Sequence, residues 1–477
     1  MNDLPNLPPD AALLDRFAAI VGDRHALHRD DDIAPYLTER RGLFAGRARL
    51  VLRPGSTGEV SAILRLANAT GTAVVPQGGN TGLVGGQTPD ASGRQIIVSL
   101  ARLNRIREVD LLSNTVTAEA GVVLQTLREA ADAADRLFAL SLASEGSCQI
   151  GGNLSSNAGG TGVLAYGNAR ELCLGVEVVL PDGEVLDDLR KLKKDNTGYD
   201  LKNLFVGAEG TLGIITAAVL KLHPKPKGRE VAWIGVASPE AALALYGLAA
   251  DRAGASLTAF ELMSERTLDF VLKHVAGSLA PLANPHPWHV LLQVSSGRSA
   301  EDARGLIEDV LGEALEHGTI RDAAIAASLA QGDAFWTLRE SMSDAQRPEG
   351  ASIKHDISVP VAAIPEFIAR AAGAVASVEP AARVVCFGHM GDGNLHYNVS
   401  QPVGTNPAAY LSRYREMNKA VHDVVRDLDG SISAEHGIGQ LKRDELIATA
   451  PPVAIDLMRR VKAAFDPAGI MNPGKLI

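Results

Sequence analysis

The chain has 477 residues, 46% hydrophobic and 21% charged, a composition typical of a soluble globular protein too long for one ordinary core. With 46 basic against 56 acidic residues, its formal net charge is -10 and it has no long basic run, which argues against nucleic acid or an anionic membrane surface as the main partner. The three cysteines are dispersed along the chain, which favours a reducing cytoplasm. The N-terminus has no apolar stretch, which argues against secretion, and no run of about eighteen apolar residues occurs, which argues against a membrane span.

The first part of the chain, to about Pro226, alternates short apolar runs with helical patterns and carries the densest glycine clusters. The polar, proline-containing segment 223–228 cannot continue a strand and predicts a domain boundary. The strands expected before it are Ala73–Pro76, Gln95–Leu100, Thr115–Ala120, Gly175–Leu180 and Leu212–Leu222.

After this boundary the pattern becomes regular and predicts two β-α-β units in tandem. This order suggests an antiparallel sheet with helices on one face, ferredoxin-like in outline. Beyond Asn406 the chain reads as mainly helical. We therefore expect an α+β protein in three parts: 1–226, 227–405, and a helical segment 406–477 that packs on both. The expected units are strand Glu230–Val236, helix Pro239–Ala253, strand Ser256–Leu262, then strand Trp288–Val294, helix Ala300–His317 and strand Thr319–Ala326.

Three glycine-rich segments lie in the first part. Segment 76–86 follows an apolar strand, and its successive N–H groups with Asn80 and Thr81 would make a cradle for a diphosphate, the alternative being a long flexible turn. Segment 144–160 is polar and made of small residues, which suggests backbone wrapped around a large ligand. Segment 207–215 leads into a β-branched strand. Neither GxGxxG after the first strand nor GxxxxGK[ST] occurs, so a Rossmann site and a Walker site are unsupported.

In this order the three segments resemble the FAD-binding domain of the vanillyl-alcohol oxidase / p-cresol methylhydroxylase superfamily, in the branch of the D-2-hydroxyglutarate and D-lactate dehydrogenases. The similarity runs nearly to the end of the chain, at 472–475. It implies a two-subdomain FAD-binding domain over 1–226 and a substrate domain over 227–405. No histidine occurs between His28 and His223, so the FAD should be bound non-covalently. The implied cofactor-binding residues are Pro76, Gly78, Gly79, Asn80, Thr81, Gly82, Ser147, Gly151, Gly152, Asn157, Gly160, Glu209, Ile215 and Asn472.

Residues 383–399 read as a strand, a turn and a strand, with the favoured two-residue turn Asp392-Gly393. If these two residues form the loop, His389 faces His396 with Cβ atoms roughly 4.5–5.5 Å apart, which suits two imidazoles on one metal or simply two satisfied polar side chains. Downstream, Glu435-His436 adds a carboxylate and another imidazole, and two histidines with a glutamate are a common catalytic zinc set. The resemblance implies His389, His396 and Glu435 as ligands, with zinc first and manganese or iron(II) as alternatives.

A predicted helix over 335–343 places Arg339 and Ser343 on one face, and a predicted strand over 352–359 carries Lys354. An arginine and a lysine in one pocket would suit a carboxylate, the alternative being solvated surface charges. Within the family that the chain resembles, this pair implies a dicarboxylic substrate, D-2-hydroxyglutarate first and D-malate second, rather than D-lactate, which lacks a distal carboxylate. The substrate contacts implied by the resemblance are Arg339, Ser343, Lys354, Asn398 and His436.

The predicted reaction is oxidation of a D-2-hydroxy acid to its 2-oxo acid with hydride transfer to FAD, His436 as general base and the metal as a Lewis acid. The family suggests an electron acceptor such as electron-transfer flavoprotein, a quinone is an alternative, and a homodimer is left open. Three rivals remain at this point: a metal-dependent hydrolase, which would leave the flavin-like segments unexplained, a non-catalytic flavoprotein, and an oxidase that makes peroxide in air.

Overall fold

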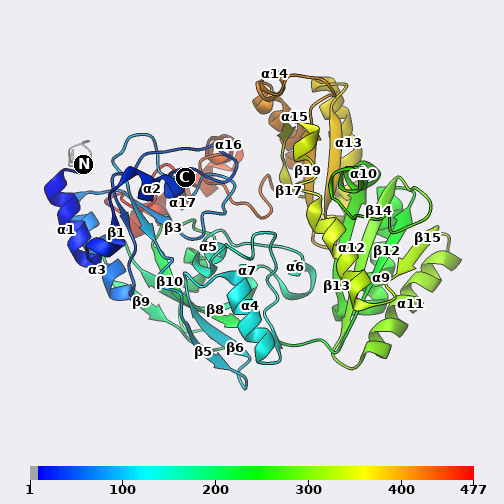
Figure 1. Cartoon of the computed structure of the whole chain (residues 1–477), viewed down its shortest axis with the longest axis horizontal. Helices are drawn as coiled ribbons and strands as arrows, with labels where there is room; N and C mark the ends of the chain where they lie inside the picture. The colour runs from blue at the N-terminus through cyan, green and yellow to red at the C-terminus, as the bar shows by residue number, and fades with distance from the viewer. Residues whose placement is uncertain (1–8) are drawn as a thin grey trace. The chain divides into compact units, whose positions relative to one another are not determined.

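The computed structural model describes residues 9–477, which form two compact units (Figure 1). The first unit comprises residues 9–159, 167–224 and 435–477. The second comprises residues 160–166 and 225–434. The chain therefore leaves the first unit at Pro224 and returns to it at Glu435. Residues 406–477, expected as a segment of their own, are divided between the two units at that point.

The first unit contains two main sheets. One has the order β1-β2-β4-β3, with β2, β4 and β3 parallel, and its apolar side chains pack with those of α1 (Ala11–Val21) and α3 (Thr57–Thr70). The other is antiparallel, with the order β5-β6-β10-β8-β9. The strands predicted from the glycine-rich half are confirmed to within two residues at each end. These five strands are β3 Val74–Gln77, β4 Ile96–Ser99, β6 Thr115–Glu119, β8 Cys173–Val179 and β10 Ile214–Lys221. The sheets also contain four strands that were not predicted: β1 Ala26–Leu27, β2 Val51–Leu52, β5 Ile106–Asp110 and β9 Val185–Asp188.

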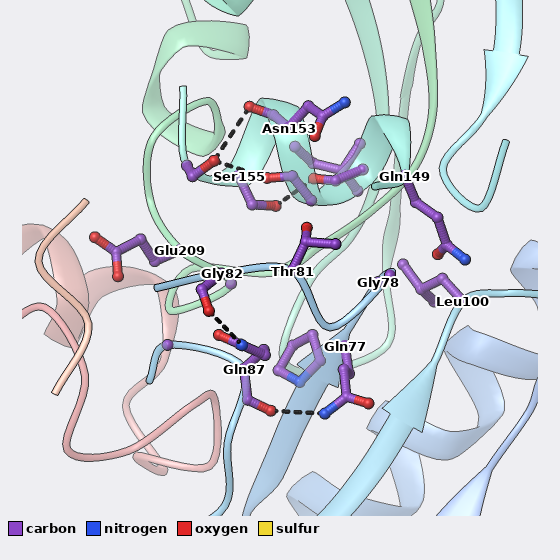
Figure 2. Close-up of a pocket in the computed structure, with 18 of the residues that line it drawn as sticks. Gln77, Gly78, Thr81, Gly82, Gln87, Leu100, Gln149, Asn153, Ser155 and Glu209 are labelled. Atoms are coloured by element: carbon purple, nitrogen blue, oxygen red, sulfur yellow. Dashed lines mark hydrogen bonds between the residues drawn. The ribbon is translucent and has the colours of Figure 1, made fainter. Parts of the chain in front are cut away.

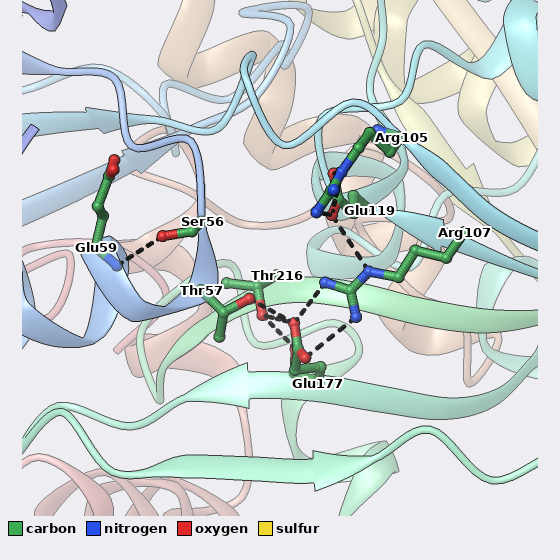
Figure 3. A network of polar contacts seen from close by, with 8 residues as sticks. All are labelled: Ser56, Thr57, Glu59, Arg105, Arg107, Glu119, Glu177 and Thr216. Atoms are coloured by element: carbon green, nitrogen blue, oxygen red, sulfur yellow. Dashed lines mark hydrogen bonds and ion pairs between the residues drawn. The ribbon is translucent and has the colours of Figure 1, made fainter.

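A buried carboxylate on β8 joins α3 to the antiparallel sheet (Figure 3). Glu177 accepts hydrogen bonds of 2.7 Å from the hydroxyls of Thr57, at the start of α3, and Thr216, on β10. The Arg107 guanidinium on β5 donates two more, at 3.1 and 3.2 Å. Burial works against the charged carboxylate, but these donors lower the pKa of Glu177 overall. This charged side chain therefore links α3 to the antiparallel sheet, beside the apolar core that the two subdomains share.

The remaining elements of the first unit are short helices and one small sheet. Strand β10 ends at Lys221, as expected of a segment that cannot continue it, and His223–Pro224 form a separate two-residue strand β11 that pairs with β7 (Arg136–Leu137). Proline can sit in a strand as short and peripheral as this one. The helices are α2 Asp30–Leu37, α4 Leu124–Ala133, α5 Ile150–Ser155, α7 Ala169–Leu172, α8 Lys202–Phe205, α16 Arg443–Thr449 and α17 Pro452–Phe465.

The second unit is built on an eight-stranded antiparallel sheet with the order β15-β12-β14-β13-β18-β19-β16, in which β17 also pairs with β19. The two predicted β-α-β units form its first half, and their strands take the 4-1-3-2 order of a ferredoxin-like sheet. The bounds are β12 Gly228–Val236, β13 Leu257–Ser264, β14 Trp288–Ser296, β15 Asp322–Ile325, β16 Ser352–Ile353, β17 Asp356–Ser358, β18 Arg383–His389 and β19 Asn394–Ser400.

Helices cover both faces of this sheet, whereas helices on one face only were expected. Along β12, Ala232 and Ile234 join the core with α9, α11, α13 and α15, while Val231 and Trp233 join a second core with α10 and α12. This alternation is the period-two pattern of a strand buried on both sides. The helices are α6 Val163–Tyr166, α9 Pro239–Ala253, α10 Glu265–His274, α11 Ala300–Glu316, α12 Leu329–Ser341, α13 Ile364–Val378, α14 Pro407–Leu411 and α15 Tyr414–Asp427.

One helical stretch among the described residues, Val361–Val378, is long and apolar enough by length and composition to cross a membrane. Core helices of soluble proteins pass the same test, so this is weak evidence for a span. Ile364, Phe367 and Ala371 on this helix are fully buried in the core of the second unit.

Candidate active site

The three glycine-rich segments meet around a cavity that lies wholly within the first unit (Figure 2). The loop after β3 forms one wall, the start of α5 forms another, and the residues before β10 close the third. The cavity therefore has the glycine-rich, backbone-lined wall expected of a site for a large cofactor.

Side-chain amides hold the loop after β3 in place. The Gln77 amide donates to the backbone carbonyl of Gln87 at 2.9 Å. The Gln87 amide donates to the side-chain oxygen of Asn80 and to the backbone carbonyl of Gly82, bonds that Figure 2 shows in part. The Asn80 amide donates in turn to the Thr38 carbonyl at 3.0 Å. The loop is therefore a fixed structure, and its conformation does not depend on β-sheet pairing.

Most of the predicted cofactor residues line this cavity, and some do not. Those on the wall are Pro76, Gly78, Gly79, Asn80, Thr81, Gly82, Gly151, Gly152, Glu209 and Ile215. Ser147, Asn157 and Asn472 lie in the same unit but not on the wall, and Gly160 belongs to the second unit. Four of the predicted residues have a left-handed backbone with φ between 43° and 53°, a conformation that is strained for a non-glycine residue and clusters at functional sites. These are Asn80, Asn157, Glu209 and Asn472.

Two features of the wall fit a bound flavin nucleotide. Gln149 is buried and lines the cavity, and its side-chain oxygen has no hydrogen-bond partner among residues 9–477. A buried amide atom without a partner costs about 1–3 kcal/mol, which a polar ligand group would offset. A Cβ atom added to Gly152 would meet nothing within 4 Å, so this wall leaves room beside the helix α5 backbone. The residues present therefore fit the group that the sequence resemblance implies.

His436, the predicted base, lines the same cavity from the C-terminal segment of the first unit. Glu209 fixes this segment, because its carboxylate accepts 2.7 Å hydrogen bonds from the backbone N–H groups of Ile438 and Gly439. Burial raises the pKa of Glu209, although both N–H donors act in the opposite direction. The Asn472 amide donates to the Glu209 carbonyl and to that of Gly86, which ties the C-terminus to the cavity walls.

The histidine hairpin forms in the second unit, but in a different register from the one predicted. Met390–Asp392 make a turn of 3-10 helix, so the loop is longer than Asp392-Gly393, and His396 lies opposite Phe387. His389 instead pairs with Glu261 on β13. The prediction was wrong by two residues, an even shift that leaves both imidazoles on one sheet face. Their ring centroids lie 6.0 Å apart.

A buried carboxylate that sequence reasoning missed lies between His389 and Arg339. Glu261 accepts from His389 Nδ1 at 2.8 Å and from Arg339 Nε at 2.9 Å. Burial disfavours the charged carboxylate, but the charges and hydrogen bonds of His389 and Arg339 lower the pKa of Glu261 to about 2. Arg339 also lies over the Phe387 ring, 5.0 Å from its centroid. A lone glutamate within the apolar strand Leu257–Ser264 was the signal, because a buried charge requires partners.

The second histidine also has a carboxylate behind it. Asp356 on β17 is the Cα partner of His396, and its Oδ1 lies 4.0 Å from His396 Nδ1. Asp356 also accepts from the Asn394 amide at 3.0 Å. Both imidazoles therefore have an acidic group on the Nδ1 side, as metal-binding histidines commonly do. Ala434, the last residue of the second unit, is bonded through its backbone N–H to the Asp356 carbonyl, and Glu435 follows it in the chain.

The predicted substrate residues differ in burial and in the elements that carry them. Helix α12 ends at Ser341, so Ser343 lies in the following turn and is exposed, whereas Arg339 is buried. The expectation that Arg339 and Ser343 share a helix face was therefore wrong. Lys354 is half-buried at a break between β16 and β17, where one continuous strand was expected. Asn398 is buried on β19 and donates to the Gln346 side chain at 3.1 Å.

Comparison with known proteins gives the same picture. The family model for FAD linked oxidases, C-terminal domain, matches residues 225–476, and that for the FAD binding domain matches residues 48–188. The D-2-hydroxyglutarate dehydrogenase of Xanthomonas citri pv. viticola is 39% identical over 89% of this chain and 88% of its own length. The mitochondrial D-2-hydroxyglutarate dehydrogenase of Danio rerio is 39% identical over 91% and 79%. The D-2-hydroxyglutarate–pyruvate transhydrogenase of Saccharomyces cerevisiae is 34% identical over 98% and 95%.

Among solved structures, p-cresol methylhydroxylase matches with a TM-score of 0.77 at 16% identity, covering 99% of this chain and 98% of that one, a likeness of fold alone. The fold and the cavity thus define a FAD-linked oxidase with a p-cresol methylhydroxylase-type FAD-binding domain. Within that class the chain belongs to the family of the FAD-dependent D-2-hydroxyglutarate dehydrogenases. The family and fold predicted from the sequence are confirmed.

Proposed function

We propose that the chain oxidises D-2-hydroxyglutarate to 2-oxoglutarate with non-covalently bound FAD and a divalent metal, zinc first, held by His389, His396 and Glu435. Relatives that are 34–39% identical over most of this chain carry this substrate in their names. When bound, the flavin accepts the hydride from substrate C2, and the metal supplies a Lewis acid for the substrate hydroxyl and carboxylate. The cavity lined by the glycine-rich segments supports the flavin part of the proposal.

Support for the metal comes from the groups behind the two histidines. Glu261 accepts from Nδ1 of His389, which leaves Nε2 as the nitrogen that can bind a cation. Asp356 stands on the same side of His396. Glu435 directly follows Ala434, whose backbone N–H donates a hydrogen bond to the Asp356 carbonyl. Two imidazoles and a carboxylate are a donor set that suits zinc, and manganese and iron(II) are the alternatives.

Arg339 is the observation that carries the choice of a dicarboxylic substrate. Its Nε and Nη2 lie 2.9 and 2.7 Å from the same Glu261 oxygen, which leaves the other N–H groups of the guanidinium to bind a second acceptor. The residue is 5% exposed, so water has little access to these groups. A substrate carboxylate is the acceptor that a guanidinium binds best. We assign Arg339 to the distal carboxylate of D-2-hydroxyglutarate, with Ser343, Lys354 and Asn398 as further contacts.

We assign the general base to His436, which lines the flavin cavity and is held in its segment by Glu209. A base must lie within hydrogen-bond reach of the proton it removes, and the substrate hydroxyl is that donor. The residues of this chain would then bind the acid at both ends, hold C2 towards the flavin and take one proton at an imidazole nitrogen. His436→Ala is expected to lose turnover while keeping its flavin.

The test is a substrate panel measured with a dye acceptor. The kcat/KM should be highest for D-2-hydroxyglutarate, lower for D-malate and D-lactate, and negligible for L-2-hydroxyglutarate. Arg339→Lys, which keeps the charge beside Glu261, should lower kcat/KM for D-2-hydroxyglutarate at least about tenfold more than for D-lactate, because one bidentate hydrogen bond to a charged group is worth about 1.5–3 kcal/mol. An equal loss on both acids would remove Arg339 from the distal carboxylate, and a preference for D-lactate would favour that alternative activity.

For the physiological electron acceptor we propose electron-transfer flavoprotein or a quinone. A dehydrogenase requires such an acceptor and makes little peroxide in air, whereas an oxidase makes one peroxide per substrate oxidised. Oxygen consumption during turnover without dye therefore separates the two.

A further inference from the structure

One carboxylate of the second unit bonds both a predicted metal ligand and the predicted substrate arginine. Glu261 lies on the central strand β13, and its Cα partner on β18 is His389. One of its oxygens accepts from His389 Nδ1, and the other accepts from Arg339 Nε. Glu261 is 1% exposed, His389 7% and Arg339 5%, so none of the three exchanges these contacts with water. The triad is therefore one buried charged unit.

The residues packed around Glu261 restrict its side chain to few other conformations. On β13, Leu262 and Met263 on either side of the strand are fully buried in the two hydrophobic cores. On the other side of the guanidinium, the Phe387 ring packs against Arg339 at 5.0 Å. A buried carboxylate that lost one of these two partners would leave an uncompensated charge, which costs several kcal/mol. The positions of His389 and Arg339 are consequently coupled through Glu261.

We propose that Glu261 is a positioning residue that fixes the tautomer and orientation of His389 for the metal and, through the same carboxylate, fixes Arg339 for the distal carboxylate of the substrate. This inference rests on the proposed function, because it requires that His389 bind a metal. With Nδ1–H donated to Glu261, the imidazole presents Nε2 with its lone pair to the cation, and the negative charge behind it makes that nitrogen a stronger ligand. Glu261 itself touches neither metal nor substrate in this assignment.

The test measures zinc affinity and does not depend on turnover. The flavin-loaded full chain is stripped of metal, and its dissociation constant for zinc is measured by competition with a coloured chelator. Glu261→Gln should bind zinc about 10–100-fold more weakly than the wild type, the usual cost of removing such a partner, with an unchanged flavin content and flavin spectrum. Glu261→Asp should recover part of the affinity, because it restores the charge at a longer distance.

The matched control is Glu177→Gln, which removes another buried carboxylate that pairs with an arginine, in the other unit. It should leave zinc affinity unchanged. Arg339→Lys should weaken zinc binding in the wild type and have no further effect in Glu261→Gln, since both act through one carboxylate.

The outcomes separate the inference from the proposed function. Wild-type zinc affinity in Glu261→Gln and Glu261→Asp would overturn the positioning role while leaving the metal in place. A wild type that binds no divalent cation would overturn the metal part of the proposed function and this inference with it. If Glu261→Gln fails to fold, Glu261→Asp and Arg339→Lys still decide, because unchanged zinc binding in both would contradict the coupling.

Discussion

Glu209 and Gly439 are joined by a 2.7 Å hydrogen bond from the backbone N–H of Gly439 to a carboxylate oxygen. The other oxygen of Glu209 accepts from Ile438 at the same distance, so the glutamate holds the segment that begins with Glu435 and His436. Glu209 is half-buried and strained, with φ of 52°. Strain of this kind persists only where the surrounding structure fixes it, and here it aims a side chain at the backbone of the predicted base segment.

Glu209→Gln is therefore expected to lower kcat for the hydroxy acid about tenfold or more while keeping most of the flavin. The amide can accept only one of the two N–H bonds, and each bond to a charged acceptor is worth about 1.5–3 kcal/mol. The measurement is steady-state turnover with a dye acceptor, alongside flavin absorbance per protein. Glu184→Gln, an exposed glutamate of the same unit, is the control and should behave as wild type. Full activity in Glu209→Gln would show that the segment is held by other means.

Two glycines of the cavity wall should respond differently to alanine. A Cβ on Gly79 would collide with the carbonyl oxygen of Ser147, whereas a Cβ on Gly152 meets nothing within 4 Å. Gly79→Ala should lower both the stability and the flavin content of the protein. Gly152→Ala should leave the melting temperature of the flavin-free protein unchanged and weaken flavin binding, because the methyl group takes space beside the helix. Normal flavin affinity in Gly152→Ala would place the cofactor elsewhere in the cavity.

The sequence predicted the strands and β-α-β units well because their apolar runs and helix periods are local signals. The hairpin register was predicted less well, because the 3-10 turn at Met390–Asp392 competes with the favoured Asp392-Gly393 turn and lengthens the loop. The packing of helices α10 and α12 against the second face of the sheet was not predicted, because the predicted sheet contained only the two tandem β-α-β units.

In the candidate site, too, the sequence predicted local features better than distant contacts. The residue types of the glycine-rich segments and of the hairpin indicated a cofactor site and a metal site, and the family resemblance implied the role of each residue. Glu261 was missed because its partners, His389 and Arg339, are 128 and 78 residues away in the chain. Gln149 was missed because an amide inside a polar segment gives no sign of burial until the fold is known.

The network around Glu177 should control the stability of the first unit. Glu177→Gln weakens four hydrogen bonds and leaves Arg107, whose side chain is 28% exposed, with less compensation (Figure 3). We expect a loss of about 2–3 kcal/mol in the free energy of unfolding, below the cost of breaking a fully buried pair because Arg107 is partly solvated. The temperature of flavin release reports on this unit. If Glu177→Gln lowers the temperature of flavin release no more than the exposed control Glu184→Gln does, Glu177 has no structural role of this kind.

His289 should make the second unit sensitive to mild acid. Trp233 donates its indole N–H to His289 Nδ1 at 3.0 Å, the other ring nitrogen faces Glu265, and burial lowers the pKa of His289 below its ordinary value of 6.5. As the pH falls below 6.5, the unfolded chain takes up a proton that the folded unit resists. The free energy of unfolding should therefore decrease, by up to about 1.4 kcal/mol per pH unit.

The three tryptophans lie in the second unit, so their fluorescence during urea unfolding at pH 7.5, 6.0 and 5.5 isolates this effect. Trp233→Phe removes the donor that opposes protonation of Nδ1. This variant should be less stable overall but should lose less of its stability between pH 7.5 and 5.5 than the wild type. An identical pH slope in both proteins would rule out His289 as the titrating group.

The most direct test of flavin- and metal-dependent D-2-hydroxyglutarate oxidation is anaerobic bleaching of the flavin absorbance, without any added acceptor. D-2-hydroxyglutarate is predicted to bleach the flavin band within the time of one turnover, and L-2-hydroxyglutarate is predicted to leave it unchanged. Complete removal of the metal should slow bleaching by the D-acid at least about a hundredfold, and added zinc should restore the rate. Bleaching by the L-acid alone, or bleaching by the D-acid that is unaffected by complete metal removal, would contradict this account.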